Sequence, residues 1–283
     1  MSVEAASKFI LKALENVDIK SLKAPLVVGI SGPQGSGKSW LTVELKSALE
    51  RALPEAIVVQ FSMDDVYLTH EEQSKVTTVA RKEGNALLQG RGLPGTHDLR
   101  LATTIFEKLK RREPVQIPRY DKSAFDGEGD RCPESQWEHV ASSDIVLFEG
   151  WFNGFCSVDS IELPYLMSGP TSVVQNYPMY HIGEINQRLK AYERIWSEFD
   201  KFIYFRTNDV NNVYTWREQQ EHALIKERGR GMSDDQVRNF VNRYMPVYSL
   251  YYRTMCDSRV CSPGNNLQLD INLDRTLSSS SIH

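Results

Sequence analysis

The chain has 283 residues, 41% of them hydrophobic, which is enough for the core of one α/β domain with insertions. The net charge of −4 argues against a protein whose main work is to hold nucleic acid. No apolar run approaches the ~20 residues of a membrane span, and Glu4 and Glu15 interrupt any signal-peptide core. The four cysteines have neither Cys-x-x-Cys nor zinc-ligand spacing, so we predict reduced thiols in a cytoplasmic protein.

The chain is predicted to begin with an amphipathic helix. Apolar residues at Ala6, Ile10, Ala13 and Leu14 recur at helical spacing and form one face. We therefore expect residues 1–24 to dock outside the core, with a disordered tail as the alternative.

The next stretch combines a strand, a glycine-rich turn and a helix. Residues 26–30 are continuously apolar, which is typical of a strand buried on both faces. The turn, residues 32–39, matches G-x-x-x-x-G-K-[ST]. After it, Leu41, Leu45 and Leu49 form the apolar stripe of a helix.

This motif is the pattern of a phosphate-binding loop (P-loop). Backbone N–H groups and the positive end of the helix form an anion site, which glycines let the phosphates approach. We predict that Lys38 reaches the β- and γ-phosphates and that the Ser39 hydroxyl ligates Mg²⁺. The residues predicted to bind ATP are Gly32, Pro33, Gln34, Gly35, Ser36, Gly37, Lys38, Ser39 and Trp40. A glycine-rich loop with an incidental lysine is the alternative.

Four further apolar runs predict strands: residues 56–59, 144–148, 202–205 and, more weakly, 267–271. Helical patterns separate them, so we predict a P-loop α/β fold with a mainly parallel sheet flanked by helices. One domain would span the chain, with its core at 25–275 and a frayed, serine-rich tail at 276–283.

Two of these strands end in carboxylates. Because parallel α/β sheets bind ligands at the carboxyl ends of their strands, these acids and the P-loop are predicted to converge. Asp64 could accept the proton of an attacking hydroxyl or help to hold the metal, whereas Asp65 is more typical of a capping residue. Glu149 is predicted to hold Mg²⁺, directly or through water. In the alternative interpretation all three acids are caps or surface residues.

A loop at residues 88–98 opens another predicted helix. We predict that Arg91, His97 and Asp98 contact the substrate. The alternative is that Asp98 only caps the helix and that His97 only packs.

A second polar loop, rich in glycine, covers residues 117–131 between a helix and a strand, which suggests a function rather than a spacer. Tyr120 and Arg131 are predicted to contact the substrate. A guanidinium can bind a carboxylate with two parallel hydrogen bonds, so Arg131 is predicted to hold a carboxylate of the acceptor. Arg91 and Lys122 are the alternatives for this contact.

The charged segment 216–230 follows the fourth strand and is predicted to be a lid that closes over ATP. Arg217 is its predicted catalytic residue, and Gly229 and Gly231 are its predicted hinges. A capping box at residues 233–236 should open the next helix. A solvated helix face is the alternative for the charges, Arg230 included.

The longer motifs resemble the D-glycerate 3-kinase family of plants and its fungal relatives. They are GPQGSGKS, SMDDVYLTHEEQ, LLQGRGLPGTHD, YDKS, GEGDRCP, LFEGWF, GMSDDQV and RYMPVY. The resemblance spans roughly residues 25–275 and is weak across 156–200. More distantly, the chain is similar to the uridine kinase, phosphoribulokinase and pantothenate kinase group, which implies a five-stranded parallel sheet.

The resemblance implies that Asp64 is the catalytic base, that Glu149 lies at Mg²⁺ and that Arg217 belongs to the lid. It also implies that His97, Asp98 and Arg131 lie on the substrate side. D-glycerate is then the expected acceptor.

The sequence therefore predicts a kinase that transfers the γ-phosphoryl group of ATP to a hydroxyl of a small hydroxy acid, with Mg²⁺. Lys38, Asp64 and Arg217 are the predicted catalytic residues, and Ser39, Glu149 and Asp64 the predicted metal ligands. We expect no nucleic-acid, membrane or obligate protein partner. A nucleoside or other metabolite kinase on the same scaffold is one alternative, and a nucleotide-dependent switch or scaffold is another.

Overall fold

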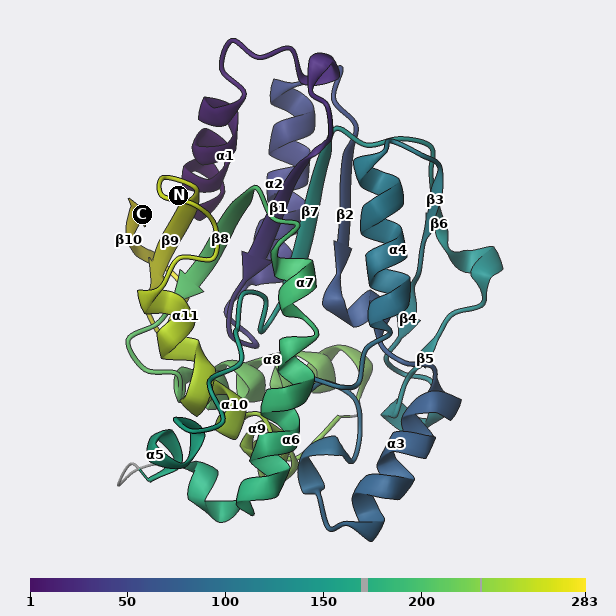
Figure 1. The fold of residues 1–283 in the computed structure, drawn as a ribbon, viewed down its shortest axis with the longest axis vertical. Coiled ribbons are helices and arrows are strands. Elements are labelled where there is room, and N and C mark those ends of the chain that lie inside the picture. The colour runs from purple at the N-terminus through teal and green to yellow at the C-terminus, as the bar shows by residue number, and fades with distance from the viewer. Residues whose placement is uncertain (169–172, 230) are drawn as a thin grey trace.

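The centre of the molecule is a six-stranded sheet with the order β10-β9-β8-β1-β7-β2 (Figure 1). The computed structural model describes residues 1–168, 173–229 and 231–283, so Arg230 of the predicted lid lies outside the described residues. The strands are β1 (Leu26–Ser31), β2 (Val58–Ser62), β7 (Ile145–Gly150), β8 (Lys201–Arg206), β9 (Asn266–Ile271) and β10 (Leu277–Ile282).

All five predicted strands are confirmed, and they pair in parallel. They are buried almost continuously, which is why they are apolar runs rather than alternating patterns. In Figure 1 their arrows run the same way, so their carboxyl ends meet at one edge.

The sixth strand corrects the expectation of a frayed tail at 276–283. Residues 277–282 form β10, which pairs antiparallel with β9 at the edge of the sheet. The run of serines has no alternation of apolar and polar residues, so its sequence carries no strand signal. The strand forms because β9 offers an open edge, and Ser279 adds a 2.6 Å hydrogen bond from its hydroxyl to Asp270.

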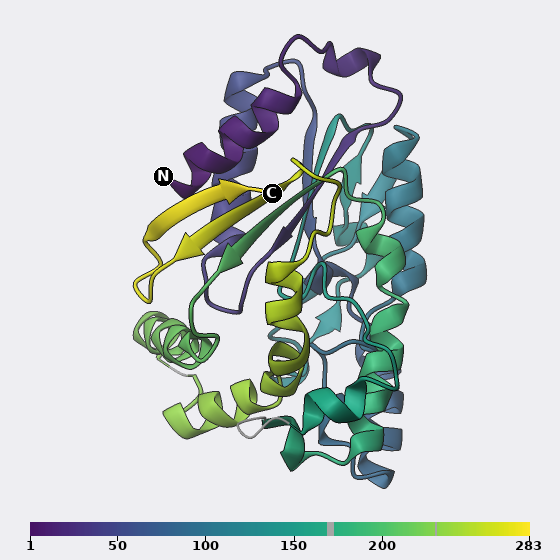
Figure 2. The ribbon, with the colours of Figure 1, turned by 60° about the vertical axis from the view of Figure 1, so that its left-hand side comes forward.

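Helices cover both faces of the sheet. Figures 1 and 2 show α1 (Ser2–Ala13) and α2 (Lys38–Ala52) on one face, and α4 (Leu99–Lys110), α7 (Glu193–Trp196) and α11 (Arg253–Asp257) on the other. The predicted first helix is confirmed and buries Ala6 and Ile10. No helix in the described ranges is long and apolar enough to cross a membrane.

A second group of elements lies beyond the carboxyl ends of the strands (Figure 1). The helices of this group are α3 (His70–Lys82), α5 (Leu163–Met167), α6 (Met179–Lys190), α8 (Asn212–Arg228), α9 (Asp234–Asn242) and α10 (Met245–Val247). Two small antiparallel pairs complete the fold: β3 (Val115–Ile117) with β6 (Glu138–Val140), and β4 (Tyr120–Asp121) with β5 (Asp130–Arg131). These elements form the walls around the end of the sheet where the candidate residues gather.

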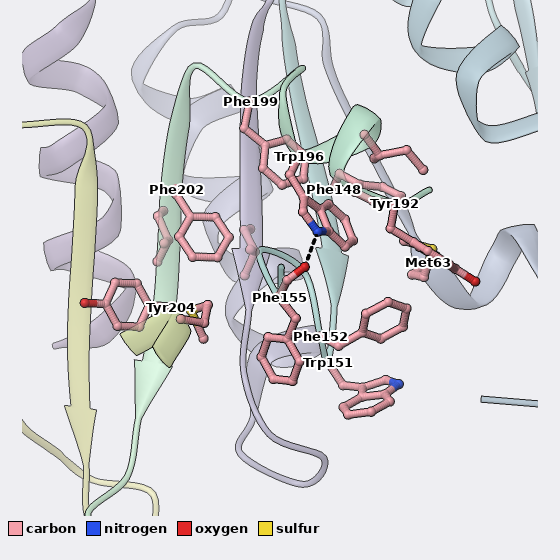
Figure 3. Packing of buried hydrophobic residues seen from close by; sticks show 14 of the residues in the cluster. Met63, Phe148, Trp151, Phe152, Phe155, Tyr192, Trp196, Phe199, Phe202 and Tyr204 are labelled. Atoms are coloured by element: carbon pink, nitrogen blue, oxygen red, sulfur yellow. Dashed lines mark hydrogen bonds between the residues drawn. The ribbon is translucent and has the colours of Figure 1, made fainter. Parts of the chain in front are cut away.

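An aromatic cluster fixes the end of β7 (Figure 3). Trp151, Phe152 and Phe155 follow the strand directly and are buried. The indole N–H of Trp196 donates a 2.7 Å hydrogen bond to the carbonyl oxygen of Phe155, drawn as a dashed line in Figure 3. Buried aromatic side chains pack closely against one another, so this cluster restricts movement of the backbone that carries Glu149.

Candidate active site

The turn between β1 and α2 has the conformation that the motif predicts. Gly37 is the N-cap of α2 with φ 96°, and Gly35 has φ 82°. Other residues adopt this region only at a cost, so the backbone favours glycine at both of these positions. Lys38 and Ser39 occupy the first turn of α2, where free backbone N–H groups can bind phosphate.

Ser39 and Glu149 meet at the mouth of this turn. The Ser39 hydroxyl donates a 2.8 Å hydrogen bond to Oε1 of Glu149. The other carboxylate oxygen, Oε2, is buried and has no hydrogen-bond partner among the residues that the structure describes. Burial raises the pKa of Glu149, and the charge of Lys38 and the bond from Ser39 only partly oppose this.

These two side chains fit Mg²⁺. A hydroxyl oxygen and an unpaired carboxylate oxygen are hard ligands, and Mg²⁺ usually takes one or two protein oxygens and completes its shell with water and substrate phosphates. Over the part of the chain that the structure describes, there is no group of three or more His, Cys, Asp or Glu side chains that could form a protein-only metal cage. The donor set therefore suits a metal shared with a nucleotide.

Asp64 lies in the short helical turn that follows β2. Its Oδ2 is 2.5 Å from the ammonium nitrogen of Lys122. Burial alone would raise the pKa of Asp64, but the charges of Lys122 and Lys38 outweigh it and lower the pKa to about 2. The carboxylate is thus ionised at neutral pH and can accept a hydrogen bond from a hydroxyl group.

Asp65 has a different task from its neighbour. Its Oδ2 accepts hydrogen bonds from the backbone N–H and the hydroxyl of Ser62, at 2.8 and 2.9 Å. These bonds close a capping box around the turn. The predicted capping role of Asp65 agrees with this geometry.

Arg91 holds the loop that carries Lys122. Its guanidinium donates to the carbonyl oxygens of Gly127 at 2.7 Å and Lys122 at 3.4 Å, and also to that of Glu128. The guanidinium is committed to the backbone, and its main effect is to place the Lys122 ammonium beside Asp64. Sequence reasoning named Lys122 only as an alternative, and its one signal was its position in a polar loop.

His97 is buried and stacks on Tyr67. The two rings stack with centroids 4.5 Å apart, and Nδ1 of His97 lies 2.8 Å from the Tyr192 hydroxyl. Burial lowers the pKa of His97 to about 3, so the ring is neutral at neutral pH. Its Nε2 is buried without a hydrogen-bond partner among the described residues, so the predicted contact of His97 with the substrate stays a prediction.

Asp98 and Arg131 bind each other. One oxygen of Asp98 caps α4 by accepting the N–H of Leu101 at 3.0 Å, and the other accepts from Arg131 at 3.3 Å. Arg131 also donates to the carbonyl oxygen of Tyr67 at 2.7 Å, and only 11% of its side chain is exposed. This pair therefore supports the wall of the site through Nη2 of Arg131, whereas Nε of Arg131 is buried without a hydrogen-bond partner among the described residues, so its predicted contact with the substrate stays a prediction.

Tyr120 keeps a free polar group. Its hydroxyl is buried and has no partner within the described part of the chain, and its ring packs edge-on with that of Tyr67, with the ring centroids 5.2 Å apart. Burial raises the pKa of Tyr120 to about 12, so the hydroxyl stays protonated and can donate to a ligand.

Arg217 lies along α8. Its guanidinium donates to Gln220 at 2.6 Å, lies 3.8 Å from Glu221 and sits 5.3 Å above the ring of Phe240. The helix ends at Gly229, which has a left-handed conformation, and the predicted hinge role of Gly229 and Gly231 stays a prediction. The predicted capping box that opens α9 is also confirmed. The contact of Arg217 with a phosphate stays a prediction.

The arrangement of sheet, P-loop and strand-end carboxylates defines a P-loop kinase, and residues 27–162 match the model of the phosphoribulokinase/uridine kinase family. The chain is 41% identical to the probable ATP-dependent kinase TDA10 of Saccharomyces cerevisiae over 91% of its own length and 88% of that protein. It is 36% identical to the chloroplastic D-glycerate 3-kinase of Arabidopsis thaliana, over 82% of this chain and 48% of the plant protein.

A solved structure described as the D-glycerate 3-kinase of Cryptococcus neoformans superposes with a TM-score of 0.90 at 36% identity, covering 100% of this chain and 99% of that one. The chain belongs to the D-glycerate 3-kinase family of P-loop kinases and is an ATP-dependent kinase. The nucleotide-dependent switch is therefore not favoured.

The first prediction concerns Lys38. Lys38→Met removes the cation expected at the β- and γ-phosphates, so kcat should fall about 10²–10³-fold while the fold persists. Lys46→Met is the matched control, because Lys46 lies on the same helix and pairs with Glu50 there. Steady-state kinetics with circular dichroism test this. A folded Lys38→Met variant with near-normal turnover would contradict it.

The second prediction separates the two neighbouring aspartates. Asp64→Asn keeps the shape but weakens the acceptor for the attacking hydroxyl, so kcat should fall about 10²–10⁴-fold with ATP binding retained. Asp65→Asn, the matched control, should chiefly lower the free energy of unfolding, by about 0.5–2 kcal/mol, because it weakens a cap. Turnover and urea unfolding of both variants decide the matter, and a reversed pattern would refute the assignment.

Proposed function

We propose that the protein transfers the γ-phosphoryl group of ATP to a hydroxyl of D-glycerate. The observation that carries this proposal is the Lys122 ammonium beside the Asp64 carboxylate. It places a cation for the acceptor's carboxylate next to the group that would orient its hydroxyl. The Lys122 side chain is 60% exposed and can therefore be reached by a substrate. The family relationship to D-glycerate 3-kinases supports the same acceptor.

On the nucleotide side, the backbone N–H groups of the P-loop and the Lys38 ammonium would hold the phosphates. Ser39 and Glu149 would hold Mg²⁺, because their oxygens are the free hard ligands at the mouth of the loop. When bound, Mg²⁺ neutralises charge on the β- and γ-phosphate oxygens. Arg217, carried by α8, would add positive charge when the lid closes.

On the acceptor side, Asp64 would accept the hydrogen bond of the attacking hydroxyl and aim its oxygen at the γ-phosphorus. A pKa of about 2 makes Asp64 a weak base in the free protein, so orientation is its main contribution before transfer. Phosphoryl transfer has a loose transition state in which the nucleophile's proton can leave late. The base therefore does not need a high pKa.

We propose Lys122 rather than Arg131 as the contact for the acceptor's carboxylate, because its ammonium is exposed and lies beside Asp64. Arg131 is largely covered and is bound to Asp98 and to the Tyr67 carbonyl oxygen. Arg91 is bound to three carbonyl oxygens. D-glycerate has only three carbons, so the cation for its carboxylate has to lie close to Asp64, as Lys122 does. The unpartnered Tyr120 hydroxyl is a second donor nearby.

A nucleoside acceptor fits the site less well. A base needs an open aromatic face or an amide-lined slot. The Tyr67 ring is 5% exposed because His97 stacks on it, and the Arg91 guanidinium sits 5.6 Å above the ring of Tyr120. Both candidate faces are therefore covered.

We further propose that the protein acts in the cytoplasm on small molecules, without nucleic acid or an obligate protein partner. The cysteines, Cys132, Cys156, Cys256 and Cys261, are all free, which suits a reducing compartment. The net charge of −4 offers little attraction for nucleic acid.

The third prediction is the choice of acceptor. Purified protein with ATP and Mg²⁺ should show a higher kcat/KM for D-glycerate than for L-glycerate, uridine, pantothenate or ribulose 5-phosphate. Coupled detection of ADP measures this, with Lys38→Met as the control for contaminating kinases. Preference for uridine or pantothenate would overturn the proposed acceptor and leave the kinase assignment in place.

The fourth prediction isolates the carboxylate. Lys122→Met should lower kcat/KM for D-glycerate about ten- to a hundredfold, the effect of losing one charge-assisted contact of ~1.5–3 kcal/mol. The same variant should change the weak activity on glycerol much less, because glycerol has no carboxylate.

Two acceptors are compared because Lys122 also pairs with Asp64. Loss of that pairing should lower the activity on D-glycerate and on glycerol by the same factor. Lys75→Met is the matched control, since Lys75 is an exposed lysine paired only with Glu71. Equal losses on D-glycerate and glycerol would show that Lys122 does not bind the carboxylate.

A further inference from the structure

The hairpin between β9 and β10 reaches the nucleotide side of the site from the far end of the sequence. Figure 2 shows its turn, in yellow, next to α8, in green. Arg275 lies in this turn with φ 66°, in the left-handed region that only a few per cent of non-glycine residues adopt. A strained conformation of this kind is a reason to look for a function of the side chain.

The Arg275 guanidinium joins three segments. Its Nε donates a 2.6 Å hydrogen bond to the carbonyl oxygen of Gly35 in the P-loop, and Nη2 donates to the carbonyl oxygen of Trp216 in α8 at 3.4 Å. The guanidinium also lies 5.9 Å from the centre of the Trp216 ring. The Trp216 indole in turn donates to the carbonyl oxygen of Leu273 at 2.6 Å.

The contact at Gly35 bears on the shape of the P-loop. The Gly35–Ser36 peptide is bonded at both ends, because its carbonyl accepts from Arg275 and its N–H donates to Pro33 at 3.1 Å. Its plane is thereby fixed, and with it the path of the backbone into Gly37 and Lys38. Preorganised N–H groups bind phosphate without first paying an ordering cost.

The contact at Trp216 bears on the lid. A Cβ atom at Gly35 would lie 2.5 Å from the Cβ of Trp216, so α8 packs directly on the P-loop. Trp216 is fully buried there and directly precedes Arg217. Arg275 therefore bonds to the loop and to the helix at the point where they touch.

We propose that Arg275 is a positioning residue for ATP: it fixes the P-loop through Gly35 and locks the Arg217-bearing helix onto it. This inference uses only the kinase activity and does not depend on the identity of the acceptor.

The hairpin does not need the Arg275 side chain for its own turn. The turn is closed by backbone hydrogen bonds between Asn272 and Thr276 at 3.0 Å and from Arg275 N–H to Asn272 at 2.9 Å. The Asp274 carboxylate also accepts from the Thr276 hydroxyl at 2.6 Å. The side chain can therefore be removed while the hairpin persists.

Arg275→Gly is the best test, because glycine adopts the left-handed conformation without strain and keeps the turn formed. We expect KM and Kd for ATP to rise about ten- to a hundredfold, as for the loss of a charge-assisted hydrogen bond, while KM for the acceptor stays within about twofold. Steady-state kinetics and calorimetric titration with ATP–Mg²⁺ measure these values. Arg253→Ala is the matched control, because the Arg253 side chain is 89% exposed and pairs with Asp257 on its own helix.

Two further measurements separate positioning from plain stability. Arg275→Lys should recover only part of the ATP affinity, because an ammonium lacks the fork that reaches two carbonyl groups. Added methylguanidine should lower KM for ATP in Arg275→Gly and not in the wild type. The proposal is overturned if Arg275→Gly keeps the wild-type Kd for ATP, or if both KM values rise together with a lowered Tm and no rescue by methylguanidine.

Discussion

The site depends on carboxylates and ammonium groups that lie together at the carboxyl ends of the parallel strands. Two carboxylates, Asp64 and Glu149, lie at this edge with two ammonium groups, Lys38 and Lys122. Partly buried like charges repel, and each carboxylate needs a cation or a metal to stay ionised. Asp64 has its cation in Lys122, and its pKa falls. For Glu149, burial and the charge of Asp64 outweigh Lys38, Lys122 and the hydrogen bond from Ser39, so its pKa rises, and a bound Mg²⁺ would stabilise its ionised form.

Three groups of contacts elsewhere in the fold keep these charged side chains in position. The aromatic cluster after β7 fixes the backbone of Glu149. The guanidinium of Arg91 donates hydrogen bonds to backbone carbonyl oxygens of the loop that carries Lys122. Arg275, at the opposite end of the chain, braces the P-loop and α8. Catalysis by positioning and electrostatics requires such rigidity, because transferring a phosphoryl group leaves the protein little covalent chemistry to perform.

Features that depend on residues close together in the sequence could be predicted from it. The P-loop, the buried strands, the Asp65 cap and the capping box of α9 follow from short runs of sequence. Pairings across long separations could not be predicted. Asp64 and Lys122 are 58 positions apart, and Gly35 and Arg275 are 240 apart. Strand β10 was missed because its serines show no periodicity and its stability comes from the open edge of β9.

We propose that the site at the carboxyl ends of the parallel strands transfers the γ-phosphoryl group of ATP to a small alcohol that carries a carboxylate. The most direct measurement is to follow the label of γ-³²P-ATP in the presence of Mg²⁺ and D-glycerate. The account predicts that the label appears in phosphoglycerate, in step with the ADP formed. Label that appears only in inorganic phosphate, at a rate unchanged by D-glycerate, would contradict it.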